Sequence, residues 1–359
     1  MKRIVPVNNK LVFFESHFGK QYSCMPLAIS TYLNEHSNFT IVWCFNDPKA
    51  YNQSVPCKIV HRLSLSYFYH LARSKYFVLN QPLPGFVKLK KNQIFVQTWH
   101  GTPLKKIAAD VSYENPLKVK KLSSNWTYLL SQNSYSTEIF RRAFLFDKTI
   151  IEEGYPKNDK FFDLNKQKIN RIKKQLRLPL NKKIILYAPT WRDGSTECFD
   201  VKIDFNNFLK DIGKDWVVVL RLHSVLSGRI KLSIFEPEKV YDFSNYDCSE
   251  DLMIASDVLI TDYSSIMFDY SVLNKPIIFY AYDLIDYADN LRGMYLDYGK
   301  TVPGPVVKTQ DSLSKQIMSL SGYWEKHGKK YTSFKKRFTN LEDGNVTKRV
   351  VERIFKLEP

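Results

Sequence analysis

The sequence predicts an α/β protein made of two doubly wound domains. Short apolar runs alternate with helix-like segments up to residue 162, and the same alternation begins again after residue 182. Such a rhythm is typical of a parallel sheet covered by helices. With 359 residues, 44% of them hydrophobic, the chain is long enough to bury two separate cores.

The first alternation, residues 1–162, contains apolar strand-like runs with helix-like runs between them. Strands are expected at 10–16, 39–45, 92–96 and 125–133, and helices at 24–36 and 136–146. Residues 66–80 run from a helix into a strand. These elements define the expected N-terminal domain.

A basic linker that includes a helix is expected at 163–182, and a second domain at 183–330. Its expected strands are 183–191, 216–224 and 239–244, and residues 249–282 read as helix, strand, helix and strand. The remaining residues, 331–359, form an expected helical segment. Its last helix is amphipathic, with an apolar face made by Val346, Val350, Val351, Ile354 and Leu357.

The charge of the chain indicates an anionic partner. Lys and Arg number 53 against 36 Asp and Glu, which gives a formal net charge of +17. Nucleic acid, an anionic membrane surface and a phosphorylated substrate all fit this charge. The run 139–146 mixes Arg141 and Arg142 with aromatic residues, so it is either a membrane-interface segment or a core helix with a solvated arginine pair.

The cysteines and the N-terminus favour a cytoplasmic protein. The five cysteines are widely spaced and contain no Cys-x-x-Cys pair, which argues against a disulfide scaffold or a zinc ribbon. The N-terminus lacks the apolar core of a signal peptide, and no apolar run approaches the roughly 18 residues of a membrane-spanning helix. A peripheral position on a membrane remains compatible with these features.

Five loops that follow expected strands carry unusual polar residues. They are 99–103, 154–159, 188–192, 221–224 and 261–265. Because ligands bind beyond the carboxyl ends of parallel strands, these loops are read together as one candidate site. Each of them alone also has an ordinary structural explanation, such as a helix N-cap at Ser264 and Ser265.

The chemistry of these loops suits a phosphorylated ligand. Ser264 and Ser265 begin a helix, where free backbone N–H groups attract anions. Arg221 and His223 lie two residues apart on one strand and therefore on one face, where the arginine can grip phosphate. His100, followed by a glycine that allows close approach, is a candidate general base.

The sequence lacks the usual metal and nucleotide motifs. It contains no Asp-x-Asp, Walker A, Gly-x-Gly-x-x-Gly or His-Glu-x-x-His pattern. Phosphate charge would then be met by Arg, Lys, His and helix termini. This predicts metal-independent chemistry without a cofactor.

The ordered motifs "WHGTPLKK", "GYPKND", "YAPTWRD", "RLHS", "ITDYSSIMFDY" and "EDGNVTKRV" resemble the CDP-glycerol glycerophosphotransferase family of teichoic-acid and capsule synthesis. The resemblance covers nearly the whole chain. It implies a GT-B-type fold, in which two Rossmann-like domains face a central cleft. It also implies transfer of glycerol phosphate from CDP-glycerol to a hydroxyl of a lipid-linked precursor, with release of CMP.

The resemblance also implies roles for individual residues. The family's two essential histidines fall on His100 and His223. Its donor-binding residues fall on Thr98, Trp99, Gly101, Thr102, Lys157, Pro189, Thr190, Arg221, Ser264, Ser265 and Asp269. In this assignment the N-terminal domain serves the acceptor and the membrane side, and the C-terminal domain binds the CDP-linked donor.

Partners and alternatives follow from the same resemblance. The expected acceptor is an undecaprenyl-diphosphate-linked saccharide at the cytoplasmic face of an anionic membrane, and the absence of a large extra N-terminal region favours a primase-like short form. The family usually has Arg where Lys157 stands, so a CDP-ribitol donor stays open. The other rivals are a GT-B glycosyltransferase that uses a nucleotide sugar and, because of the net positive charge, a non-catalytic nucleic-acid-binding protein. No nucleic-acid-binding motif is present, and no nucleic-acid partner is expected.

Overall fold

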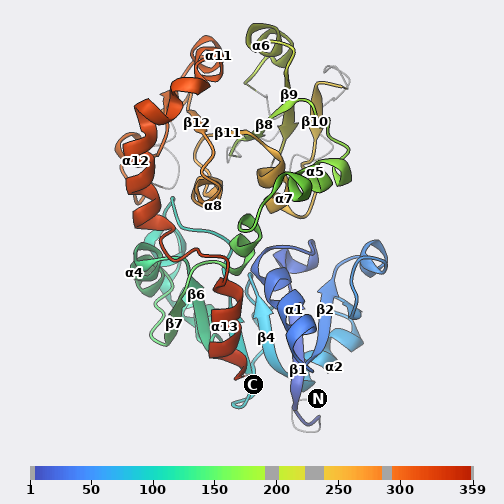
Figure 1. Cartoon of the computed structure of the whole chain (residues 1–359). Coiled ribbons are helices and arrows are strands. Elements are labelled where there is room, and N and C mark those ends of the chain that lie inside the picture. The colour runs from blue at the N-terminus through green and yellow to red at the C-terminus, as the bar shows by residue number, and fades with distance from the viewer. Residues whose placement is uncertain (1–4, 191–201, 223–237, 285–292, 357–359) are drawn as a thin grey trace. The chain divides into compact units, whose positions relative to one another are not determined.

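The computed structural model describes residues 5–190, 202–222, 238–284 and 293–356. The chain divides into two compact units (Figure 1). Unit 1 contains Met1–Thr102, Ile107–Phe162 and Asn340–Pro359, and unit 2 contains Pro103–Lys106 and Asp163–Thr339. Within these described ranges, no helix is both long and apolar enough to cross a membrane.

Unit 1 is built on a seven-stranded sheet in the order β3-β2-β1-β4-β5-β6-β7, in which every pair is parallel. Its strands are β1 (Asn8–Glu15), β2 (Thr40–Phe45), β3 (Lys58–His61), β4 (Ser74–Leu79), β5 (Ile94–Gln97), β6 (Tyr128–Ser131) and β7 (Thr149–Glu152). Its helices are α1 (Cys24–His36), α2 (Leu65–Arg73), α3 (Pro116–Ser123), α4 (Ser134–Ala143) and α13 (Val346–Phe355).

Unit 2 is built on a six-stranded parallel sheet in the order β10-β9-β8-β11-β12-β13. Its strands are β8 (Lys183–Ala188), β9 (Trp216–Leu220), β10 (Val240–Asp242), β11 (Val258–Thr261), β12 (Ile277–Tyr280) and β13 (Val306–Val307). Its helices are α5 (Lys166–Gln175), α6 (Phe205–Ile212), α7 (Ser249–Ala255), α8 (Ile266–Val272), α10 (Tyr298–Thr301), α11 (Gln310–Met318) and α12 (Tyr323–Phe338).

The two strand orders have the same form. Numbered from the first strand of each unit, both begin 3-2-1-4-5-6, which is a strand order of doubly wound sheets. The predicted α/β class with parallel sheets is therefore confirmed. The central strands are almost wholly apolar because helices cover both faces of each sheet.

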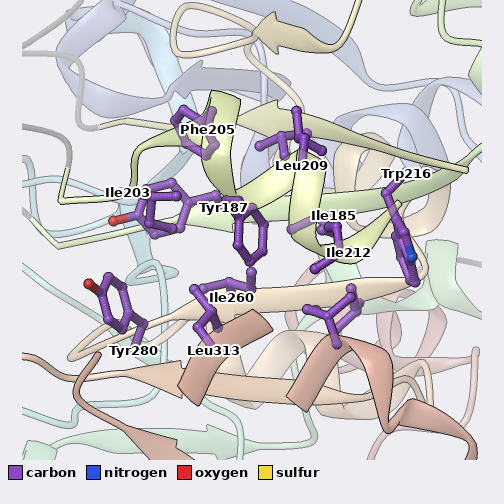
Figure 2. Close-up of a cluster of buried hydrophobic side chains, with 14 of the residues drawn as sticks. Ile185, Tyr187, Ile203, Phe205, Leu209, Ile212, Trp216, Ile260, Tyr280 and Leu313 are labelled. Atoms are coloured by element: carbon purple, nitrogen blue, oxygen red, sulfur yellow. The ribbon is translucent and has the colours of Figure 1, made fainter. Parts of the chain in front are cut away.

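Each sheet has its own hydrophobic core. In unit 2, Ile185 and Tyr187 of β8 pack in one cluster with Phe205 and Leu209 of α6 and with Leu313 of α11 (Figure 2). The apolar side chains of α6 recur at helical spacing, so one face of the helix is buried on the sheet. In unit 1, the matching cluster joins strands β1, β2 and β4 to helices α1 and α13.

The C-terminal part of the chain differs from the expected domain boundaries. Residues 331–359 were expected to form one separate segment, but the chain divides between Thr339 and Asn340. Helix α13, drawn in red beside the strands of unit 1, buries Val346, Val350 and Ile354 in the core of that unit (Figure 1). The expected linker 163–182 contains helix α5 and belongs to unit 2.

Pro103–Lys106 also departs from the expected boundaries. The N-terminal domain was expected to contain all of residues 1–162, yet this short segment belongs to unit 2. There the backbone N–H of Tyr295 donates to the carbonyl of Leu104 at 2.9 Å, and the N–H of Lys106 donates to the carbonyl of Gly293 at 3.1 Å.

The run 139–146 is part of the core of unit 1 and not an exposed interfacial segment. Phe140 is fully buried, and Phe144 and Phe146 are 5% and 3% exposed. Arg142 forms an ion pair with Asp110 at 2.9 Å, and Arg141 donates to the carbonyl of Phe146. Of the two interpretations of this run, the core helix is the one that these side chains fit.

Candidate functional site

The loop after β5 holds His100 in a constrained backbone. The N–H of Thr98 donates to the carbonyl of Leu79 at 2.8 Å, which continues the pairing with β4. Trp99 then turns the chain with a φ of 56°, a left-handed conformation that few residues other than glycine adopt. The side-chain oxygen of Gln97 accepts from the N–H of Trp99 at 3.0 Å. The strand end therefore fixes the direction in which the next residue, His100, leaves the sheet.

The imidazole of His100 lies in a defined environment. The indole of Trp99 stacks on it with ring centroids 4.2 Å apart. Its Nδ1 lies 3.4 Å from the carbonyl oxygen of Asn80, which can only accept, so Nδ1 carries the proton in this contact and Nε2 holds the lone pair. Desolvation and, to a lesser degree, the charge of Lys157 lower the pKa of His100 to about 4, against the ordinary value of 6.5. The ring is therefore neutral near pH 7, with the lone pair on Nε2 available to accept a proton, although the lowered pKa makes it a weaker base than an ordinary imidazole.

Lys157 reaches the same strand-end loop from the short helix η4 (Pro156–Phe161) after β7. Its side chain is buried, and Nζ donates to the carbonyl oxygen of His100 at 3.3 Å. The ammonium also lies 5.8 Å from the ring centroid of Tyr155. The sequence alone placed these two residues in separate loops, and the structure brings them into contact within unit 1.

The C-terminal segment supports the Lys157 loop. The carboxylate of Asp159 accepts from the backbone N–H groups of Val346 at 3.0 Å and Thr347 at 2.7 Å. These are the first two residues of α13, so Asp159 caps that helix from a distant part of the chain. The hydroxyl of Thr347 donates to the carbonyl of Pro156 in return.

Two predicted donor-binding loops of unit 2 meet at the end of β8 and β11. The carboxylate of Asp262 accepts from the N–H of Thr190 at 2.8 Å and from the N–H of Tyr263 at 2.6 Å. This links Pro189 and Thr190 to the loop that leads into Ser264. In the strand order of unit 2, β8 and β11 are the neighbours at which the order reverses. Doubly wound sheets bind ligands in the crevice at this position.

Arg221 follows β9, the other neighbour of β8, and is already engaged in hydrogen bonds. Its Nη1 donates to the carbonyls of Phe243 at 2.8 Å and Ser244 at 3.1 Å, and also to the carbonyl of Tyr246. Burial lowers the pKa of this guanidinium. Arg221 therefore orders the loop after β10, in addition to any contact with a ligand. The second predicted histidine, His223, lies outside the described residues.

The remaining predicted residues are also placed. Ser265 is the N-cap of α8 without a side-chain hydrogen bond to that helix, and the N–H of Ile266 lies 3.4 Å from the hydroxyl of Ser264. Asp269 is 4% exposed. Thr102, two residues after His100, donates to the side-chain oxygen of Gln132.

Among the residues that the structure describes, no group of three or more His, Cys, Asp and Glu side chains is arranged to hold a metal ion.

Several polar residues near the predicted site were not recognised in the sequence. His17 lies with its ring 6.0 Å from that of His100, and Asn80, Gln132 and Glu342 bond to residues of the unit 1 loops. Three of them follow strands: His17 comes two residues after β1, and Asn80 and Gln132 come directly after β4 and β6. A polar residue at the end of each buried strand was thus a usable signal. Glu342 carried no such signal, because it belongs to a distant segment.

These features define a class of protein: two doubly wound α/β units whose strand-end loops present an imidazole, a buried lysine and an arginine. The chain belongs to the CDP-glycerol:poly(glycerophosphate) glycerophosphotransferase family, whose sequence pattern matches residues 1–356.

Two relatives illustrate the membership. The teichoic acid poly(glycerol phosphate) polymerase of Bacillus subtilis (strain 168) is 41% identical over 373 residues, which include 99% of this chain and 50% of that protein. The teichoic acid glycerol-phosphate transferase of Staphylococcus aureus (strain NCTC 8325 / PS 47) is 40% identical over 370 residues, 97% of this chain and 94% of that protein. The chain thus spans half the length of the first relative and most of the second.

A solved structure agrees with these relatives. The wall teichoic acid polymerase TagF, as a variant soaked with CDPG, superposes with a TM-score of 0.91 at 36% identity. The match covers 98% of this chain and 89% of that chain. The α/β fold with two parallel sheets is therefore shared along nearly the whole chain.

Proposed function

We propose that this chain transfers glycerol phosphate from CDP-glycerol to a hydroxyl of a teichoic-acid or capsule precursor and releases CMP. The observation that carries the proposal is the likeness to TagF, at 36% identity and a TM-score of 0.91 over 98% of this chain. The family described for residues 1–356 and the two teichoic acid relatives support the same activity.

In the proposed reaction, Nε2 of His100 accepts the proton of the acceptor hydroxyl. The acceptor oxygen forms a bond to the phosphorus next to glycerol, and the bond from that phosphorus to the CMP oxygen breaks. Arg221, His223 and the Ser264–Ser265 helix start hold the diphosphate and stabilise the charge on CMP as it leaves. Positioning and charge stabilisation supply most of the rate in such phosphoryl transfers.

The finer parts of the proposal concern fold type, acceptor and conditions. We assign a GT-B-type arrangement, in which two Rossmann-like domains face a central cleft, and two doubly wound sheets in separate units support it. We assign an undecaprenyl-diphosphate-linked saccharide as the acceptor, and a peripheral position at the cytoplasmic face of the membrane. The formal net charge of +17 supports attraction to an anionic leaflet. The chemistry is proposed to need no metal or other cofactor.

The decisive experiment measures CMP release and product mass after incubation with a lipid-linked disaccharide and either CDP-glycerol or CDP-ribitol. Release with CDP-glycerol is expected, and release with CDP-ribitol alone would overturn the assignment of the polyol. His100→Ala and His223→Ala should each abolish most of the release. Near-wild-type release by both variants would refute the mechanism.

Two further arms test the conditions. Added EDTA should leave the rate of CMP release unchanged. If EDTA abolished the release and only a divalent cation restored it, the chemistry would not be metal-independent. Sedimentation with vesicles of anionic lipid should occur at low salt and weaken as salt rises. A protein that stays in the supernatant at low salt would contradict the membrane assignment.

A further inference from the structure

Glu342 is a carboxylate for which the proposed reaction has no direct use, yet it bonds to groups from two strand-end loops of unit 1. Its Oε1 accepts from Nε2 of Gln132 at 2.8 Å, from Nδ2 of Asn158 at 3.0 Å and from the backbone N–H of Tyr155 at 3.1 Å. Three donors on one oxygen favour the ionised carboxylate, and hydrogen bonds to an ionised acceptor are stronger than neutral ones.

One arm of this arrangement leads to the loop of His100. Gln132 directly follows β6, the strand between β5 and β7, so its side chain lies between the two loops. While its Nε2 donates to Glu342, its Oε1 accepts from the hydroxyl of Thr102, two residues after His100. The amide of Gln132 therefore links Glu342 by two hydrogen bonds to Thr102, in the loop that carries the imidazole.

The other arm leads to the loop of Lys157. Tyr155 and Asn158 lie on either side of Lys157, and both donate to the same oxygen of Glu342. The N–H of Asn158 also donates to the carbonyl of Tyr155 at 2.9 Å, which closes the turn. Two anchors, one before and one after Lys157, leave the loop little freedom to move its ammonium.

The two arms meet again, because Nζ of Lys157 donates to the carbonyl of His100. Chain and hydrogen bonds together thus form a closed ring through Thr102, Gln132, Glu342, the Lys157 loop and back to His100. A closed ring restrains its members more strongly than separate contacts do, since moving one member breaks several bonds.

The backbone beside Glu342 is shaped to admit its carboxylate. Gly154 has a φ of +97°, and a Cβ built on it would lie 3.2 Å from Oε2 of Glu342 and 2.9 Å from Cγ2 of Val346. Only glycine combines this conformation with the close approach. Glu342 lies four residues before Val346, the first residue of α13, and that helix is packed in the core of unit 1. The segment that carries Glu342 is therefore itself held in place.

From this ring we infer that Glu342 is a positioning residue, which fixes His100 and Lys157 relative to each other without touching the reacting atoms. The inference rests on the proposed function for its kinetic consequence. Its structural content, that one carboxylate holds both loops, can be tested without any substrate.

The experiment compares four variants and one control variant in CMP release from CDP-glycerol, with kcat and KM measured separately. Glu342→Ala should lower kcat by about tenfold or more and raise KM for CDP-glycerol by about threefold or more, because both loops lose their anchor. Gln132→Ala cuts only the arm to His100 and should lower kcat with KM within about twofold of wild type. Asn158→Ala cuts one anchor of the Lys157 arm and should mainly raise KM.

Glu342→Gln serves as the conservative variant. Its amide oxygen can accept the same hydrogen bonds, so it should recover most of the kcat that Glu342→Ala loses. The matched control is Glu352→Ala, which removes an exposed carboxylate from α13 and should leave both constants unchanged. Thermal unfolding of every variant separates loss of position from loss of fold.

A second readout does not depend on activity. Amide hydrogen exchange of Glu342→Ala should show faster exchange in both 98–102 and 154–158, while the core strands keep their protection. Two results would overturn the inference. One is unchanged exchange in either loop; the other is a loss of activity that is the same in all variants and is explained by their loss of thermal stability. A wild-type protein that releases no CMP from CDP-glycerol would overturn the proposed function instead, and the exchange result would still decide the role of Glu342.

Discussion

The ammonium of Lys157 donates a hydrogen bond to the backbone carbonyl of His100 at 3.3 Å, across 57 residues of sequence. The contact places a positive charge beside the candidate base and binds the loops after β5 and β7 to each other. The same charge contributes to the lowered pKa of His100. Lys157 therefore has two effects in unit 1, one on geometry and one on the ionisation of the imidazole.

Replacing Lys157 tests both effects. Lys157→Met keeps most of the length of the side chain but removes the charge and the donor, so kcat/KM for CDP-glycerol should fall by about tenfold or more. Lys157→Arg keeps the charge and should lose less, although its planar fork fits the buried site differently. The control is Lys160→Met, an exposed lysine three residues further on. Equal rates for wild type and Lys157→Met would show that the ammonium contributes nothing to the reaction.

The pH dependence of the rate follows from the lowered pKa of His100. A base must be neutral to accept a proton, and a pKa of about 4 in place of 6.5 keeps the ring neutral down to mildly acidic pH. The acidic limb of kcat/KM should therefore lie well below pH 6.5. In Lys157→Met, loss of the nearby charge raises the pKa of His100, so the limb should move to higher pH. A limb at pH 6.5 in wild type would contradict this account.

The same shift has a consequence for stability. His100 takes up its proton near pH 4 in the folded state but near pH 6.5 in the unfolded state. Its contribution to the free energy of unfolding is therefore fully present above pH 6.5 and is lost as the pH falls toward 4. Urea unfolding of wild type and His100→Gln at pH 7 and pH 5 measures it. The loss of stability between these pH values should be smaller in the variant.

Arg221 is expected to matter for stability as well as for binding. Arg221→Ala leaves the carbonyls of Phe243, Ser244 and Tyr246 without this donor, and should lower the free energy of unfolding by about 2 kcal/mol. Lys210→Ala removes an exposed cation from α6 and is the control. If Arg221→Ala lost activity while its free energy of unfolding stayed unchanged, the guanidinium would act only in ligand binding and not in stability.

Much of the fold could be predicted from the sequence because long elements carry a clear period. The expected helix 24–36 matches α1 residue for residue, and the helix and strand expected in 66–80 correspond to α2 and β4. Strand β3 was not expected. Strand β7 was implied only by the polar loop 154–159 that follows it, and it was given no bounds. Helix α12 was expected only in its second half, within the helical segment 331–359. In its first half the lysines and Gly328 interrupt the apolar spacing that would indicate a helix.

The site was only partly predictable, for a topological reason. The loops that carry His100 and Lys157 could be recognised as strand ends, but their contact depends on β6 lying between β5 and β7. Local sequence patterns predict single strands but not which strands lie side by side. The role of Glu342 depends in addition on the return of residues 340–359 to unit 1, which no periodicity in the chain indicates.

Two glycines of unit 2 lead to opposite predictions for the same substitution. A Cβ on Gly304 would lie 1.9 Å from the carbonyl oxygen of Ile277 in β12 and 2.8 Å from the hydroxyl of Tyr323. That hydroxyl is hydrogen-bonded to both the N–H and the carbonyl of Ile277, so neither neighbour can move without breaking the junction of β12 with α12. Gly304→Ala should therefore lower the free energy of unfolding by about 3 kcal/mol or more.

Gly328 lies inside α12, and a Cβ built there meets no atom within 4 Å. Glycine within a helix costs about 0.5–1 kcal/mol relative to alanine, because it loses more backbone freedom on folding. Gly328→Ala should therefore raise the free energy of unfolding by about that amount. Urea unfolding followed by circular dichroism compares both variants with wild type. If Gly304→Ala were as stable as wild type, the close packing of β12 against the segment before β13 would be wrong; if Gly328→Ala were less stable, α12 would have a neighbour on that face.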